Sequence, residues 1–347
     1  MTIVSSTRPV TGGVDTHLDV HVAAVVDANG GVLGVESFTT TPAGHLALNA
    51  WLLSFGVVER VGVEGTGAYG AGLARHLADQ GLVVIEVDRP NRQERRRNGK
   101  SDELDAIEAA RGALSGRVAG LAKAGTGNVE ALRALLVAKR SARSMRISAV
   151  VRLRHLMFTA PDELRQRLAP LSVNALVNEA ARLRPRPDGD PVVCATKTAA
   201  VSLAGRAQAL DAELELLDTQ IEPLVKATAP ALLNVYGCGF DTAAVLLTAA
   251  GDNSARIRSE AAWAKLCGVA PIPAMSGKSN GRYRLNPGGN RHANNALWRI
   301  VLTRLGQHQP RTVAYMNRRL AEGKTKPEIM RCLKRYVARE VYRALPR

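Results

Sequence analysis

Apolar and polar positions along the first third of the chain predict a mixed α/β unit. Apolar runs at residues 12–17 and 19–27 have the spacing of strands, and Asn29-Gly30-Gly31 supplies a turn before a third run. Beyond this point, helical spacing alternates with short buried runs. The further elements predicted are a strand at 32–39, a helix at 42–55, a strand at 60–64, a helix at 68–80, a strand at 82–88 and a helix from Asp102.

The order of these elements restricts the fold. Three consecutive strands followed by alternating strands and helices describe an antiparallel meander that parallel crossovers continue. Few folds have this order, and the ribonuclease H-like α/β fold is the best known of them. We therefore expect a ribonuclease H-like N-terminal domain over residues 9–125.

The middle of the chain, residues 126–228, has the pattern of long helices. An amphipathic, arginine-rich segment runs from Asn128 to about Phe158, and residues 196–226 carry apolar side chains at nearly coiled-coil spacing. This pattern fits an intramolecular helical hairpin and an arm for dimerisation equally well, so the sequence leaves both open.

Residues 229–347 predict a third, mostly α-helical domain. Its first segment resembles a helix-hairpin-helix with Gly237-Cys238-Gly239 as the hairpin, a motif that presents backbone N–H groups to phosphates. A glycine turn between packed helices explains the same residues. Residues 259–271 have helical spacing, and residues 274–292 form a glycine-rich basic loop without an apolar period. Helices then complete the chain.

Charge is distributed unevenly along the sequence. The net charge is +16, yet residues 1–88 contain three lysines and arginines against nine aspartates and glutamates. Residues 89–347 contain 44 against 22, and the segment from Ala270 onward contains 17 against three. An acidic N-terminal segment followed by a strongly basic remainder favours nucleic acid as the binding partner. A solvated basic surface would have the same composition.

Cysteine and histidine usage bears on the compartment and on metals. The four cysteines lie far apart and form no CxxC pair, which is typical of free thiols in a reducing compartment. The histidines form no HExxH motif, which argues against a zinc site. Without a signal peptide or an apolar run of membrane length, we expect a cytoplasmic, nucleoid-associated protein that does not bind membranes.

Four acidic residues form the strongest candidate for chemistry. Asp15 lies at the centre of the first predicted strand, and Glu64 ends the fourth. Asp102 and Asp105 fall one turn apart on a helix that Ser101 can cap. In a ribonuclease H-like fold these elements are neighbours, and the four carboxylates would suit Mg²⁺ or Mn²⁺ and phosphodiester cleavage. Acids in a first helical turn also complement the helix dipole, which is the simpler explanation of Asp102 and Asp105.

Arginine and lysine side chains suited to binding phosphate directly precede Asp102 and Asp105 in the sequence, and they recur in the glycine-rich loop at 274–292. Their spacing shows no apolar period that core packing would explain. The predicted nucleic-acid-binding residues are Arg92, Arg95, Arg96, Arg97, Lys100, Lys278, Arg282, Arg284 and Arg291.

Several ordered motifs carry a family resemblance. They are GGVDTHLDV from Gly12, VGVEGTGAYGAGLARHL from Val61, GKSDELDA from Gly99, and GVAPIPAMSG from Gly268, followed by Gly289-Asn290-Arg291. With these motifs the chain resembles the DEDD transposases of the insertion sequence 110 family. The resemblance covers nearly the whole chain except the middle helices.

The resemblance implies a function and a set of residue roles. Asp15, Glu64, Asp102 and Asp105 would be the metal-binding tetrad of a RuvC-like domain, and Ser276 the serine nucleophile of the C-terminal transposase domain. Family members are implied to recombine DNA as dimers or tetramers, guided by a structured RNA that the element encodes. From the residues alone, Ser276 has cations nearby but no obvious base, and Ser279 is the nearest rival.

Three other functions remain open at this point. A RuvC-like nuclease or resolvase would use the four acids with water as the nucleophile. A sugar kinase or actin-like ATPase would use Glu64-Gly65-Thr66-Gly67 as a phosphate loop, although the chain lacks a second actin-like half. A non-catalytic nucleic-acid-binding protein descended from a transposase would need none of the acids, yet all four are present.

Overall fold

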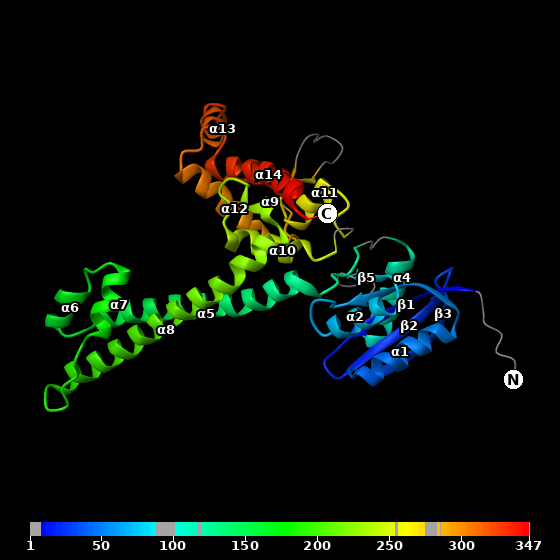
Figure 1. Ribbon diagram of the computed structural model, residues 1–347, viewed down its shortest axis with the longest axis horizontal. Coiled ribbons are helices and arrows are strands. Elements are labelled where there is room, and N and C mark those ends of the chain that lie inside the picture. The colour runs from blue at the N-terminus through cyan, green and yellow to red at the C-terminus, as the bar shows by residue number, and fades with distance from the viewer. Residues whose placement is uncertain are drawn as a thin grey trace. The chain divides into compact units, whose positions relative to one another are not determined.

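The computed structural model describes residues 8–87, 101–116, 120–253, 256–274, 283–284 and 286–346. The chain divides into two compact units. The first comprises Met1–Gly127 with Ala250–Ala262 and Arg347, and the second comprises Asn128–Ala249 with Trp263–Pro346. Figure 1 labels most of the helices and strands of both units.

A five-stranded mixed sheet forms the centre of the first unit. Its strands, in chain order, are β1 (Pro9–Thr16), β2 (Val20–Asp27), β3 (Val32–Thr39), β4 (Val57–Glu64) and β5 (Val84–Val87). Across the sheet the order is β3-β2-β1-β4-β5. The first three strands pair antiparallel, whereas β4 joins β1 and β5 joins β4 in parallel. The antiparallel meander continued by parallel crossovers is therefore confirmed.

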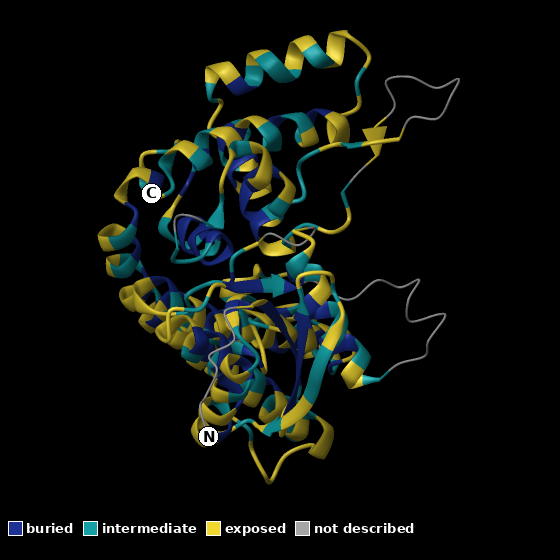
Figure 2. Ribbon diagram, turned by 90° about the vertical axis from the view of Figure 1, so that its right-hand side faces the viewer, coloured by how far each residue is buried: buried dark blue, intermediate teal, exposed yellow. Residues whose placement is uncertain are grey.

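Helices cover both faces of this sheet because the strands alternate apolar side chains between them. On one face, Val25 and Val61 share a core with Leu48 of α1 (Pro42–Ser54) and Leu73 of α2 (Ala71–Asp79). On the other face, Ala24 packs against α4 (Asp102–Leu114). Buried positions, dark blue in Figure 2, run along the strands, while the helices alternate between buried and exposed turns.

Two glycines allow α4 to lie unusually close to the sheet. Gly13 of β1 and Gly62 of β4 are Cα partners in the parallel ladder. A Cβ at Gly13 would lie 2.1 Å from the backbone nitrogen of Ala110, and one at Gly62 would lie 2.4 Å from the carbonyl oxygen of Ala109. Since α4 presents alanines to these glycines, its backbone rests almost directly on the two central strands.

The edge of the sheet at β5 is extended by the residues that follow α4. The Glu86 N–H donates to the Gly120 carbonyl at 2.8 Å, and the Ala122 N–H donates to the Val84 carbonyl at 3.0 Å. An additional strand-like segment thus pairs with β5 in antiparallel fashion.

A segment far away in the sequence completes this edge. Asp252 accepts backbone N–H groups from Ala124 and Thr126 at 2.8 and 2.7 Å. The Arg256 guanidinium donates to the Leu121 carbonyl at 3.1 Å and to the Glu86 carboxylate at 2.8 Å. These contacts explain why residues 250–262 belong to the first unit.

The second unit begins with two long helices, α5 (Gly127–Phe158) and α8 (Pro191–Thr228), which run side by side in opposite directions (Figure 1). Ion pairs of Lys139 with Asp218 and of Arg146 with Asp211 link them. Between them in the chain, α6 (Asp162–Leu168) and α7 (Val173–Ala181) pack against their far end in an alanine- and leucine-rich core. Within this chain the two helices form the intramolecular hairpin that the sequence allowed.

The remainder of the second unit is a compact group of shorter helices. Gly237, with φ of +82°, makes the turn between the first two of them, so the glycine turn is present. A two-stranded antiparallel ladder precedes the last three helices. In chain order the elements are α9 (Pro230–Leu233), α10 (Phe240–Ala250), α11 (Glu260–Leu266), β6 (Ile272–Pro273), β7 (Tyr283–Arg284), α12 (Arg291–Gly306), α13 (Pro310–Ala321) and α14 (Lys326–Ala344).

Three sequence-based expectations were wrong in detail. Asp15 lies one residue before the end of β1 rather than at its centre, because the strand starts earlier, at Pro9. The helical spacing of residues 42–55 predicts Leu46 and Leu53 on the inner side of the helix together with Leu48 and Leu52, but Leu46 and Leu53 are 58% and 49% exposed. The basic loop, expected to lack structure, contains strand β7.

Candidate metal centre

Asp15 is one of two buried acids in the candidate site. It lies two residues after Gly13 on the same face of β1, the face that α4 covers. Only 6% of its surface is exposed. The close seating of α4 therefore places a carboxylate against the first turn of that helix.

Glu64 and Asp105 reach the same place from different elements. The half-buried Glu64 follows Gly62 by two residues on β4, and the buried Asp105 lies near the start of α4 with 4% of its surface exposed. Together with Asp15 they line a pocket of about 190 Å³. The structure thus brings three of the four predicted acids together from three elements.

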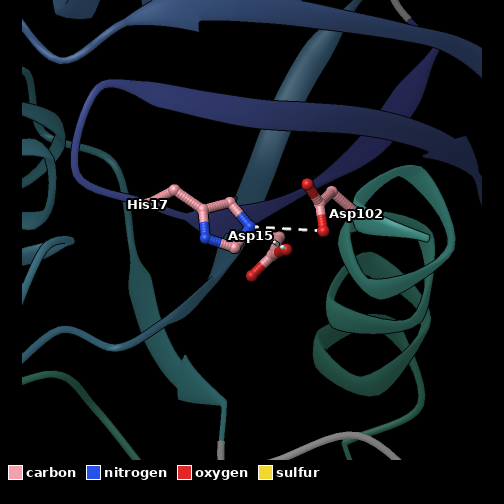
Figure 3. Close-up of side chains that lie close together, drawn as sticks. All are labelled: Asp15, His17 and Asp102. Carbon is pink, nitrogen blue, oxygen red and sulfur yellow. Dashed lines mark hydrogen bonds and ion pairs between the residues drawn. The ribbon is translucent and has the colours of Figure 1, made fainter. Parts of the chain in front are cut away.

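Asp102, the fourth acid, joins the cluster through a histidine that sequence reasoning missed. His17 Nε2 lies 3.0 Å from an Asp15 oxygen and 3.3 Å from an Asp102 oxygen (Figure 3). Asp102 is about half exposed, and Ser101 caps its helix by accepting from the Leu104 N–H, as predicted. The available signal was the Asp-x-His spacing, because residues two apart at a strand end share one face.

The electrostatics of the cluster favour a bound cation. Burial raises the pKa of the Asp15 carboxyl above its ordinary value, and the neighbouring Asp105 and Asp102 carboxylates raise it further. His17 acts in the opposite direction and lowers it. Charged oxygens held this close and partly out of water are stabilised by a cation between them.

The donor set fits a divalent metal. One ligand atom each from Asp15, His17 and Asp102 lie within 4.8 Å of one another. Carboxylate oxygens are the ligands of hard divalent cations, and an imidazole nitrogen is compatible with several metals. The geometry supports a divalent ion.

The turn after β4 shapes the wall of this pocket. Gly65, with φ of +69°, starts the turn, and the Thr16 hydroxyl donates to the Glu64 carbonyl at 2.8 Å. This bond joins the ends of β1 and β4, the strands that carry Asp15 and Glu64.

Two of the predicted nucleic-acid-binding residues meet in the second unit. Arg284 on β7 and Arg291 at the start of α12 are exposed and line a common pocket of about 910 Å³. The remaining predicted contacts and the proposed nucleophile lie outside the described residues: Arg92, Arg95, Arg96, Arg97, Lys100, Ser276, Lys278 and Arg282.

Within the described ranges, no helix combines the length and the apolar composition that crossing a bilayer requires.

Comparison with known proteins identifies the family. Residues 12–160 match the family model of the IS110 transposases with the DEDD domain, and residues 229–317 match that of the transposases of the IS116/IS110/IS902 family. A protein of insertion element IS110 from Streptomyces coelicolor, described as uncharacterized and of 43.6 kDa, is 32% identical over 126 residues. That match covers 36% of this chain and 31% of the relative. With both characteristic regions present in order, the chain belongs to the IS110 family of transposases.

Proposed function

We propose that the protein is a DNA transposase or recombinase that cuts and rejoins DNA during insertion-sequence transposition. The observation that carries this proposal is the convergence of Asp15, Glu64 and Asp105 on one pocket, with Asp102 joined through His17. In this proposal the first unit is a RuvC-like, ribonuclease H-like domain. The mixed sheet with its meander and parallel crossovers supports that assignment.

The four carboxylates would hold Mg²⁺ or Mn²⁺. Such ions, when bound, neutralise charge on the scissile phosphate and on the leaving oxygen. Asp15 and Asp105, both buried, would be the most rigid ligands, whereas the half-exposed Asp102 faces solvent. His17 would keep Asp15 and Asp102 together by its contacts to both.

Ser276 is proposed as the nucleophile. Its hydroxyl would lose its proton as the oxygen attacks phosphorus and forms a serine–phosphate ester, while the bond to the departing sugar oxygen breaks and that oxygen takes up one proton, so no net proton is gained or lost. The ester conserves the energy of the broken phosphodiester, so strands can be rejoined without an external energy source. Attack by water would release free ends instead.

The proposed partners are donor and target DNA and a structured guide RNA. The family resemblance supports the RNA and an assembly of two or four copies, in which one protomer's carboxylates act with another's serine. The basic regions at Arg89–Lys100 and 270–347 would contact phosphates. Because each contact between a basic residue and a phosphate releases counterions, the large number of basic residues predicts that affinity for nucleic acid falls steeply as the salt concentration rises.

The carboxylate site is tested by single substitutions. Asp15→Ala, Glu64→Ala and Asp105→Ala should abolish Mg²⁺-dependent DNA cleavage while nucleic-acid binding persists. Asp19→Ala is a matched control, because Asp19 is an exposed acid near the same strand but outside the pocket. Full cleavage by Asp15→Ala or Glu64→Ala would refute the site.

The nucleophile is tested separately. Ser276→Ala should abolish strand exchange and any protein–DNA adduct that survives a denaturing gel, whereas Ser279→Ala should keep both. An adduct lost only in Ser279→Ala would move the assignment to that residue. Metal-dependent nicking by the unsubstituted protein without any adduct would favour the water-using RuvC-like nuclease.

A further inference from the structure

Two adjoining pockets cross the surface formed by α13 and α14 in the second unit. Their volumes are about 910 and about 680 Å³. Both are lined by Tyr315, Arg318 and Tyr336, so the three side chains stand where the pockets meet. We call the combined depression the tyrosine groove. Its extent suits a chain of several residues or nucleotides more than a single small anion.

The charge of the tyrosine groove is strongly positive. Among the described residues that line the larger pocket, eight are lysine or arginine and one, Glu328, is acidic. Glu328 accepts from the backbone and hydroxyl of Thr325 in the capping box of α14. In the smaller pocket, Glu340 pairs with Arg304 at 2.7 Å. The acids are therefore engaged in structural contacts, and most of the lining charge remains positive.

The aromatic side chains are arranged as a platform. Tyr336 is 46% exposed and meets Tyr315 edge to face, with ring centroids 5.4 Å apart. Arg318 lies over the Tyr315 ring at 5.3 Å, and Arg339 lies near the Tyr336 ring at 6.0 Å. A half-exposed tyrosine held by a second ring offers apolar surface to a flat ligand at little cost in conformational entropy.

The Tyr315 side chain is anchored to α14 by a hydrogen bond. Its hydroxyl is hydrogen-bonded to the Cys332 thiol of α14, and burial together with this bond raises the pKa of Tyr315 to about 12. The bond to Cys332 links the Tyr315 ring to α14, while Tyr336 is half exposed.

We propose that the tyrosine groove binds an unpaired strand of nucleic acid, with one base stacked on Tyr336 and the flanking phosphates held by Lys324 and Arg331. A cationic track with interleaved aromatic rings is the arrangement by which proteins hold single strands without reading their sequence. A paired duplex keeps its bases stacked internally and offers no free base face to Tyr336. The ligand is therefore an unpaired phosphodiester strand, whether an RNA loop or a displaced DNA strand.

This inference rests on the proposed function in that the ligand is nucleic acid, but it concerns a different surface and a different step. The carboxylate pocket would act on the scissile phosphate, whereas the tyrosine groove would retain a strand that is not cut. Each can fail without the other.

The test uses the full-length protein and fluorescence anisotropy with a labelled single strand of roughly a dozen nucleotides. Four probes are compared: single-stranded DNA, single-stranded RNA, duplex DNA, and a single strand of equal length without bases. Tyr336→Leu should bind both base-containing strands about tenfold more weakly, as expected from loss of one stacked base. Tyr336→Phe, which keeps the ring, should stay within about twofold. If Tyr336→Leu loses affinity for only one of the two, single-stranded RNA or single-stranded DNA, that nucleic acid is the ligand of the groove.

Controls separate stacking from folding and from charge. Tyr236→Leu removes an exposed tyrosine of the same unit outside both pockets and should leave all affinities unchanged. Arg331→Gln should weaken all single strands, including the one without bases. If Tyr336→Leu reduces binding of the base-free strand as much as that of the others, or affects duplex alone, base stacking in the groove is refuted. DNA cleavage in Mg²⁺ is measured separately for Tyr336→Leu. Cleavage that persists supports the proposed function even if base stacking in the groove is refuted.

Discussion

Gly13 and Gly62 lie opposite each other in neighbouring parallel strands, and both face the backbone of α4 rather than its side chains. Added Cβ atoms would lie 2.1 and 2.4 Å from α4 backbone atoms, distances that no side-chain movement relieves. The helix that carries Asp102 and Asp105 is therefore positioned by the absence of two side chains on the sheet.

Gly13→Ala should push α4 away from the sheet. We expect the free energy of unfolding to fall by roughly 1–3 kcal/mol, which is the usual cost of overpacking. Metal binding should also weaken, because Asp105 would move away from Asp15. Gly12→Ala is the matched control on the opposite face, where the added methyl meets side chains rather than backbone: Leu52 at 3.1 Å and Val61 at 3.3 Å. Urea unfolding and Mn²⁺ titration measure the two effects. Equal behaviour of the two variants would contradict the seating of α4 described here.

Asp15→Asn should stabilise the metal-free protein, because it removes a buried charge beside the Asp102 and Asp105 carboxylates. The thermal midpoint in EDTA should rise by roughly 2–4 °C, which about 1 kcal/mol produces in a protein of this size. The further rise that Mn²⁺ gives the unsubstituted protein should disappear. Asp19→Asn, at an exposed acid, should change neither midpoint. A lower midpoint for Asp15→Asn in EDTA would show that Asp15 is not under repulsion.

His21 should make the first unit sensitive to acid. It is fully buried on β2, stacked on His45 with centroids 5.6 Å apart, and no described residue makes a hydrogen bond to either ring nitrogen. Burial, helped by the nearby His45 and His17, lowers its pKa from 6.5 to about 4. Between these values the unfolded chain binds a proton that the folded chain does not, so stability falls as the pH drops through this window. The full effect is about 3 kcal/mol.

His21→Phe should remove most of this dependence. Thermal midpoints at about pH 7.5 and about pH 5 should differ much less in His21→Phe than in the unsubstituted protein. His155→Phe, at an exposed histidine, should retain the original difference. An unchanged difference in His21→Phe would mean that other groups cause the loss of stability in acid.

Arg256→Ala should release residues 250–262 from the edge of the sheet. The guanidinium satisfies the Leu121 and Ala250 carbonyls and the Glu86 carboxylate, so its removal should cost about 1–3 kcal/mol. Hydrogen exchange should quicken in peptides covering 120–126. Adding Glu86→Gln should recover part of the loss, since the carboxylate is then no longer left without its cation. Strictly additive effects would show that the pair does not interact.

The sequence by itself determined the elements and their order. Strand alternation, the Asn29-Gly30-Gly31 turn and the Ser101 cap are local signals, because each depends on residues close together in the chain. The same signals placed Glu64 and Asp105 at the ends of elements that a mixed sheet brings together, whereas they placed Asp15 at the centre of its strand rather than near the end. Helical spacing did not reveal which side of α1 is buried, since Leu46 and Leu53 satisfy it as well as Leu48.

Only the tertiary structure decided the rest. The contact of His17 with Asp102, the seating of α4 on Gly13 and the return of Arg256 to Glu86 join residues 85, 97 and 170 positions apart in the chain. No periodicity encodes such pairs, because they arise from packing surfaces that form only when the sheet and its helices are assembled. The pairing of α5 with α8 is likewise visible only in the tertiary structure, where the ion pairs Lys139–Asp218 and Arg146–Asp211 link the two helices.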